Sequence, residues 1–148
     1  MKNKVTILLC LCLSIGFLSS CKKDEDDKPR KDLLSASTCW KITKYEERNS
    51  EGNFVDVTND TYDACELDDC NRFTTDGNYV LTDSGVKCNP DDNVLDQGTW
   101  VLADGDKKLI ISSTNGFVLT LNIESMDANT IVTTTSFLGP ETRITFKN

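Results

Sequence analysis

The chain has 148 residues, of which 24 are Asp or Glu, 16 are Lys or Arg and none is His, for a formal net charge of −8 at pH 7. The lack of histidine excludes Ser-His-Asp and Cys-His catalysis, and the negative charge argues against nucleic acid as a partner, because its phosphates require a basic surface. From Leu33 to Asn148 there are 116 residues, the size of one domain with a single core.

The first segment has the form of a secretory signal peptide. Lys2 and Lys4 supply a positive start, and the run from Val5 to Leu18 is apolar except for three residues. The run has 14 residues, whereas a helix that crosses a bilayer needs about 20. We therefore expect residues 1–20 to be a signal peptide that is removed, and a permanent membrane span is the weaker interpretation.

The junction after this segment reads Leu18-Ser19-Ser20-Cys21 and resembles the lipobox of bacterial lipoproteins. The resemblance implies a diacylglycerol thioether on Cys21, cleavage before this residue and an acylated new N-terminus carrying palmitate-type chains. Two or more chains hold a protein stably on a bilayer, so the lipid bilayer is the first expected partner. The alternative is a soluble secreted protein in which Cys21 is incidental.

Residues 21–32 form the next segment, which is highly charged and has no large apolar side chain to bury. Such a segment cannot repay the entropy of ordering, so we expect a flexible tether. Its lysine pair followed by four acidic residues, next to Cys21, looks like the export signal of Bacteroidota lipoproteins. The resemblance implies a lipid anchor in the cell outer membrane with the domain facing the exterior. A merely solvated charge run is the alternative.

Four cysteines remain for the folded domain once Cys10 and Cys12 leave with the signal peptide and Cys21 carries lipid. They are Cys39, Cys65, Cys70 and Cys88. An even set in an exported chain predicts disulfides, with three possible pairings. Zinc is the alternative, but the chain has neither a Cys-x-x-Cys motif nor a histidine. We therefore expect no metal and no cofactor.

From residue 33 onward the chain is expected to be the folded domain, residues 33–148, with one helical turn at Leu33–Ser37 and a short helix around Tyr62–Leu67. Elsewhere apolar and polar residues alternate with a period of two, which indicates about eight half-buried strands separated by short turns. Asp76-Gly77-Asn78 is a tight hairpin signal. Because closing a meander removes its exposed edges, the predicted fold is all-β, a small antiparallel up-and-down barrel. A sandwich is the alternative.

The order and spacing of several motifs resemble the lipocalin-like domains of Bacteroidota lipoproteins. These motifs are Cys39-Trp40, Cys65-Glu66-Leu67-Asp68-Asp69 followed by Phe73, Asp76-Gly77-Asn78-Tyr79, Cys88-Asn89 and Gly98-Thr99-Trp100. The resemblance implies a Cys65–Cys88 disulfide, which leaves Cys39–Cys70 as a second one, and a basic side chain, Arg143, covering Trp40. In lipocalins proper the first strand carries Gly-x-Trp, whereas this chain has Thr38-Cys39-Trp40.

Two non-catalytic functions follow from such a barrel. Its interior either holds a small apolar ligand or is filled by its own side chains, in which case the loops 56–69 and 89–96 would bind protein or glycan at the cell surface. The side chains expected to line a cavity are Trp40, Phe73, Tyr79, Trp100, Phe117, Leu119 and Leu121. Paired aspartates at 68–69 and 91–92 lie in polar loops, where solvated charge is their ordinary role, so we predict no enzyme activity.

Calcium at Asp91, Asp92 and Asp96 is a further hypothesis, because oxygen ligands suit this ion. The loop lacks the pattern of an EF-hand. We therefore interpret these residues as solvent-exposed charge.

Overall fold

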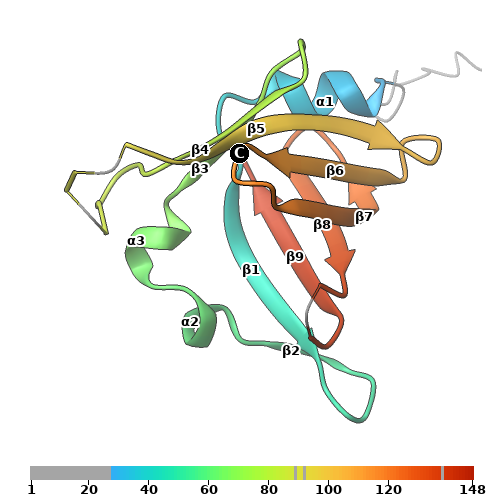
Figure 1. The fold of residues 1–148 in the computed structure, drawn as a ribbon. Helices are drawn as coiled ribbons and strands as arrows, with labels where there is room; N and C mark the ends of the chain where they lie inside the picture. The colour runs from blue at the N-terminus through green and yellow to red at the C-terminus, as the bar shows by residue number, and fades with distance from the viewer. Residues whose placement is uncertain (1–27, 89, 92, 138) are drawn as a thin grey trace, which may run out of the picture.

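The computed structural model describes residues 28–88, 90–91, 93–137 and 139–148. The expected signal peptide, the lipidation site Cys21 and the tether up to residue 27 lie outside the described residues. Within the described part the chain forms three short helices and nine strands (Figure 1). The helices are α1 Arg30–Ala36, α2 Thr58–Thr61 and α3 Ala64–Leu67. None of these helices has the length and apolar character that crossing a membrane requires.

All nine strands belong to one antiparallel sheet, with the order β2-β1-β9-β8-β7-β6-β5-β4-β3. The strands are β1 Lys41–Arg48, β2 Phe54–Asp56, β3 Cys70–Phe73, β4 Asn78–Thr82, β5 Val94–Ala103, β6 Lys108–Ser113, β7 Val118–Met126, β8 Thr130–Thr135 and β9 Thr142–Lys147. The predicted all-β, lipocalin-like fold is confirmed. The described part has nine strands, close to the roughly eight expected, and two of them are short: β2 has three residues and β3 has four.

The sheet curves strongly (Figure 1) but is not closed by a strand ladder. A single bridge between Trp40 and Asn71 joins the start of β1 to β3. Farther along β1, the edge that faces away from β9 bonds to the start of the α2 segment instead of to β3. Tyr45 N donates to Thr58 Oγ1 at 2.8 Å, and Val57 N donates to Tyr45 O at 3.0 Å. The connection between β2 and β3 thus occupies the edge that a longer β3 would need for full closure.

Alternate residues of the strands point to a shared core on the inner face of the curved sheet. On β9, for example, Thr142, Ile144 and Phe146 are buried while the residues between them are only half-buried. The core cluster takes side chains from α1 and from most strands: Leu34, Trp40, Phe73, Tyr79, Trp100, Leu109, Ile111, Leu121, Ile123, Ile131, Ile144 and Phe146. This is the burial pattern that period-two alternation predicts.

Helix α1 packs on one end of the sheet. Leu33 and Leu34 are buried, and Arg30 Nη1 donates to Asp106 O in the β5–β6 turn at 2.7 Å. The antiparallel register puts the β3–β4 and β7–β8 turns at this same end, which we call the α1 end. We call the opposite end the loop end; it carries the β1–β2, β4–β5, β6–β7 and β8–β9 connections. The helix begins at Arg30, so residues 30–32 are part of the folded domain and not of the tether.

Candidate functional site

The inner face brings together most of the side chains predicted to line a cavity. Five of the seven, Trp40, Phe73, Tyr79, Trp100 and Leu121, are buried within the core cluster, and Leu119 is half-buried against it. The Phe73 ring lies 5.3 Å from that of Tyr79 and 5.8 Å, edge-on, from that of Trp100, measured between centroids. These aromatic rings form one continuous apolar wall.

Phe117 departs from this arrangement. Its side chain is 43% exposed, and its ring stands edge-on to that of Phe137, with centroids 4.9 Å apart. Phe117 was expected to point inward because it lies two residues before Leu119. It immediately precedes β7, however, so the alternation of this strand does not apply to it. Phe137, which sequence reasoning did not single out, lies in the β8–β9 connection, where no strand period marks it.

Trp40 is fully buried, and its indole Nε1 donates to Leu34 O of α1 at 2.9 Å. The implied cover of Trp40 by Arg143 is wrong. Arg143 is paired with Glu46 in the β1–β9 register, between the inward-facing Thr142 and Ile144, and therefore lies on the outer face. There its Nε and Nη2 each donate to the Glu46 carboxylate at 2.8 Å.

Glu46 is only 4% exposed and lies at the centre of a group that we call the outer-face cluster, formed with Lys44, Arg48, Phe54 and Arg143. Lys44 Nζ adds a contact at 2.7 Å, and the guanidinium groups of Arg48 and Arg143 lie 4.4 and 4.3 Å from the centroid of the Phe54 ring. The hydrogen bonds from Arg143 hold the pKa of Glu46 below its usual range, against the opposing effect of burial. The cluster ties β1, β2 and β9 together.

Polar groups also occur on the inner face. Tyr79 OH donates to Asn71 Oδ1 at 3.0 Å, and Asn71 Nδ2 donates to Trp40 O at 3.1 Å. Burial raises the pKa of Tyr79 well above its usual range. Thr133 is fully buried on β8. Its Oγ1 donates to Ile144 O at 3.5 Å, so both hydroxyl groups are hydrogen-bonded within the protein.

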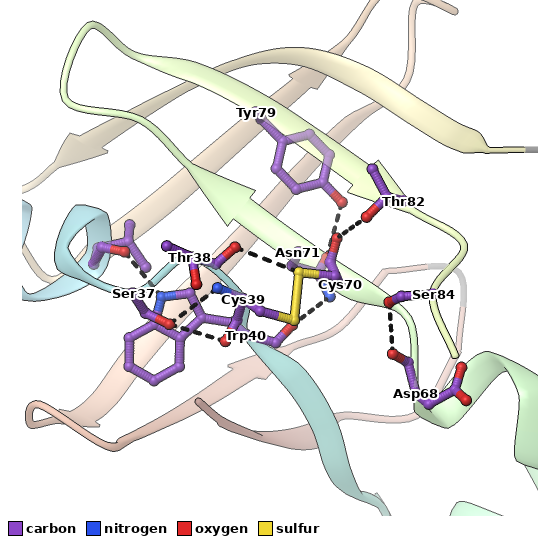
Figure 2. The surroundings of a disulfide bond; sticks show 11 residues. Ser37, Thr38, Cys39, Trp40, Asp68, Cys70, Asn71, Tyr79, Thr82 and Ser84 are labelled. Carbon is purple, nitrogen blue, oxygen red and sulfur yellow. Dashed lines mark hydrogen bonds between the residues drawn. A yellow bond between two sulfur atoms is a disulfide. The ribbon is translucent and has the colours of Figure 1, made fainter. Parts of the chain in front are cut away.

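Two disulfides bind the region around β3. Figure 2 shows the one between Cys39 and Cys70. Cys39 pairs with Cys70, with a Cα–Cα distance of 5.0 Å, and Cys65 pairs with Cys88, with a Cα–Cα distance of 5.3 Å. The predicted disulfides and the pairing implied by the resemblance are confirmed. Cys39–Cys70 lies directly beside the Trp40–Asn71 bridge.

The family model of the lipocalin-like domain matches residues 38–133, more than half of the chain. The chain belongs to the lipocalin-like domain family. The matched range runs from the residue before Cys39 to the middle of β8 and so contains both disulfides and most of the aromatic wall. No curated protein matches the chain significantly.

In this lipocalin-like domain the loop end is rimmed by apolar side chains. Of the eight large apolar residues exposed in the described chain, seven lie in or beside its connections: Val55, Val86, Val94, Leu95, Phe117, Val118 and Phe137. The eighth, Val101, lies within β5. Exposed apolar side chains are common one at a time, but Phe117 and Phe137 stand against each other. The α1 end, by contrast, is covered by Leu33 and Leu34.

Several pockets of the lipocalin-like domain open to solvent. One of about 380 Å³ lies at the α1 end, between Lys31, Asp106 and Trp100. Another, of about 500 Å³, follows β4 and β5 and is lined in part by Tyr79 and Gly98. Both are open surface pockets and not enclosed cavities, and each shares one aromatic residue with the core cluster.

The paired aspartates differ in their surroundings. Asp69 is buried beside a half-buried Asp68, at the start of β3, and is not the solvated charge we expected. In the β4–β5 connection Asp92 lies outside the described residues, and Asp96 belongs to β5, where it accepts a hydrogen bond from Ser113 Oγ. Among the described residues no three His, Cys, Asp or Glu side chains stand together as a ready metal site.

Proposed function

We propose that this lipocalin-like domain is the exposed part of a lipid-anchored lipoprotein of the cell outer membrane and that it binds a small apolar molecule without catalysis. The lipobox at Leu18–Cys21 and the acidic run behind it support the anchor and its outward orientation. The chain enters the domain through α1, so an anchor at Cys21 would be attached at the covered end. The apolar loop end would then be free to meet ligands.

The observation that carries the binding function is the contrast between the two ends of the sheet. Leu34 of α1 is fully buried and covers one end of the aromatic wall, whereas Phe117 and Phe137 at the other end expose nearly half of their surface. Half-buried Leu119 lies between this rim and the core. A ligand that enters at the loop end would bury the rim and contact Leu119, which favours an apolar molecule because each Å² removed from water contributes about 25 cal/mol.

The second candidate is an interaction module with a filled interior, in which the loops bind protein or glycan. The observation in its favour is that Trp40, Leu121 and Thr133 of the inner face are almost completely buried by the protein itself. In that case the rim and the acidic loop 56–69 would be the contact surface.

Native mass spectrometry after mild extraction tests the ligand directly, because a retained small molecule would add a defined mass. A titration with a fluorescent fatty acid analogue then locates the site. We expect Leu119→Arg to weaken probe binding at least tenfold, because a charge at the junction of rim and core would have to be desolvated. Val101→Arg, at an exposed position beside the pocket of the α1 end, should bind normally if the ligand enters at the loop end. Unchanged binding by Leu119→Arg would favour the filled-interior module.

The anchor is tested separately. Metabolic labelling with a palmitate analogue should mark the wild-type chain and leave Cys21→Ser unlabelled. Protease added to intact cells should degrade the domain if it faces the exterior. An unlabelled wild-type chain would contradict the anchor without bearing on ligand binding.

A further inference from the structure

One small region of the described chain contains all of its buried side-chain oxygens that lack a hydrogen-bond partner. These are Asp68 Oδ1, Asp69 Oδ1, Asp83 Oδ1 and Asp83 Oδ2. Asp69 and Asp83 are each 8% exposed. Burying an ionised carboxylate without a partner is costly, and proteins normally compensate such a charge with a cation or a proton. Asp83 is the extreme case, since neither of its oxygens is satisfied.

The register of the sheet places these carboxylates side by side. Cys70 of β3 is opposite Thr82 of β4, so Asp69 and Asp83, which flank this pair, occupy facing positions. Their proximity is also felt electrostatically: burial raises the pKa of Asp69, a hydrogen bond from the backbone of Ser84 lowers it, and the nearby charges of Asp83, Asp68 and Glu66 raise it.

Asp68 is held next to the pair by the segment that follows Asp83. Val86 N donates to Asp68 Oδ2 at 2.8 Å, and Ser84 Oγ donates to Asp68 O at 2.9 Å (Figure 2). Gly85 makes this contact possible, because a Cβ atom there would lie 2.2 Å from Asp68 Oδ2. One oxygen of Asp68 is thus fixed while the other, Oδ1, stays buried and unpaired.

The two disulfides restrain this region from both sides. Asp68 and Asp69 lie in the short stretch between Cys65 and Cys70, and Asp83 lies between Cys70 and Cys88. The covalent links to β1 and to the β4–β5 connection keep the two acidic segments from moving apart to relieve their repulsion. Such restraint reduces the entropy that would be lost when an ion binds.

We propose that Asp69 and Asp83 bind a divalent cation, with Asp68 adding negative charge beside them, and that this cation is Ca²⁺. Carboxylate oxygens without sulfur or imidazole suit a hard cation, and Ca²⁺ tolerates an irregular shell of 6–8 oxygens that includes water and carbonyl groups. Because no three such side chains among the described residues already converge on one point, the ion would be held by the carboxylate pair and would complete its shell with water. This proposal departs from our sequence-based expectation of no metal and is independent of the apolar-ligand function.

Calorimetric and thermal titrations of the oxidised mature chain, stripped with chelator, test the proposal at pH 7. With CaCl₂ we expect one site with a dissociation constant of about 0.1–1 mM, in the range of extracellular calcium modules, and a melting temperature raised by about 5 °C at 5 mM. Asp83→Asn should weaken binding at least tenfold. Asp32→Asn, an exposed aspartate of α1 with the same change in charge, should respond like the wild type.

Two results would overturn the proposal directly: calcium neither binds the wild type nor raises its melting temperature, or Asp83→Asn binds calcium as tightly as the wild type. A third would also overturn it: the melting temperature rises when the pH is lowered from 7 to 5, but calcium at pH 7 does not raise it. The last would show that Asp69 and Asp83 are compensated by a shared proton. If Asp83→Asn does not fold, amide shifts of the wild type during the calcium titration decide the matter. They should be largest at Asp69, Asp83 and Ser84, and changes confined to other residues would contradict the site.

Discussion

Trp40 and Asn71 exchange both of their backbone hydrogen bonds, at 2.8 and 2.9 Å, and this one bridge is where the two ends of the sheet meet. The side chain of Asn71 adds a third hydrogen bond to Trp40 O, and Tyr79 OH holds that side chain in place. This seam between the start of β1 and β3 therefore contains few backbone hydrogen bonds. Its integrity should therefore depend on the Cys39–Cys70 disulfide beside it (Figure 2).

Replacing Cys39 and Cys70 together by serine should weaken this seam. The disulfide joins residues 31 positions apart, and the chain-entropy model gives a loss of about 3–4 kcal/mol in unfolding free energy, measured by urea denaturation. Replacing Cys65 and Cys88 should cost a similar amount. Hydrogen exchange distinguishes the two, because the amides of Trp40 and Asn71 should exchange faster only when Cys39–Cys70 is absent. Equal protection in both variants would show that the bridge does not need the disulfide.

The outer-face cluster makes a prediction about pH. The pKa of Glu46 is lowered in the folded state from its ordinary value of 4.5, chiefly by the hydrogen bonds from Arg143. A carboxyl group with a depressed folded-state pKa stabilises the fold above its unfolded pKa, and this contribution is lost as pH falls through the folded value. Wild-type stability should therefore decline below about pH 4.5. Glu46→Gln should show a shallower decline in chemical denaturation measured from pH 7 to 3.

At pH 7 Glu46→Gln should itself lower the unfolding free energy by about 1.5–3 kcal/mol, the typical contribution of hydrogen bonds to a charged group. Glu51→Gln in the exposed β1–β2 turn is the matched control and should change stability by less than about 0.5 kcal/mol. If both variants follow the wild-type pH profile, the Arg143–Glu46 pair does not contribute to acid stability.

The strands and turns were predictable from sequence because they depend on local rules. The expected turn at Asp76-Gly77-Asn78 has its glycine at a φ of 88°, as a tight turn requires. The outward position of Arg143 follows from the alternation of β9, but its partner Glu46 was not predictable, because a bulge between Ile42 and Lys44 shifts the alternation of β1. Strict alternation from Trp40 would place Glu46 on the inner face, whereas the bulge turns it outward to meet Arg143.

Long-range register accounts for what else sequence reasoning missed. Asp69 and Asp83 belong to separate loops in the sequence, and only the pairing of β3 with β4 makes them neighbours. Phe137 likewise meets Phe117 through the β7–β8 pairing and the chain that follows it. No periodic pattern in the sequence indicates either of these contacts. The disulfide pairing could be predicted because the family resemblance implied it.

Leu34→Ala tests how far α1 contributes to the core. Leu34 is fully buried, and its carbonyl accepts the Trp40 indole N–H. Removing the side chain should lower the unfolding free energy by about 2–5 kcal/mol, the range for leucine truncation that leaves a cavity. Leu95→Ala, at a rim position that is 40% exposed, should cost less than about 1 kcal/mol. A loss of unfolding free energy as small as that of Leu95→Ala would mean that the packing of α1 contributes little to the core.

The close approach of β5 and β6 at Gly98 gives the most local prediction. A Cβ atom at Gly98 would lie 2.0 Å from Ser112 O and 2.9 Å from Ser113 Cα, and both are backbone atoms that cannot rotate away. Gly98→Ala must therefore displace one strand in the middle of the sheet, where Gly98 pairs with both Tyr79 and Ser113. We expect a loss of at least about 2 kcal/mol, toward the upper part of the range for overpacking.

Gly139→Ala is the matched control, because a Cβ atom at Gly139 would meet no other atom within 4 Å. Its stability should be unchanged or raised by about 0.4–1 kcal/mol through the lower entropy of the unfolded chain. Urea denaturation of the two variants under identical conditions gives the comparison. Since both substitutions add one methyl group to a glycine, a difference between them isolates the contact with Ser112. Equal stabilities would mean that β5 and β6 are farther apart at this position than the structure shows.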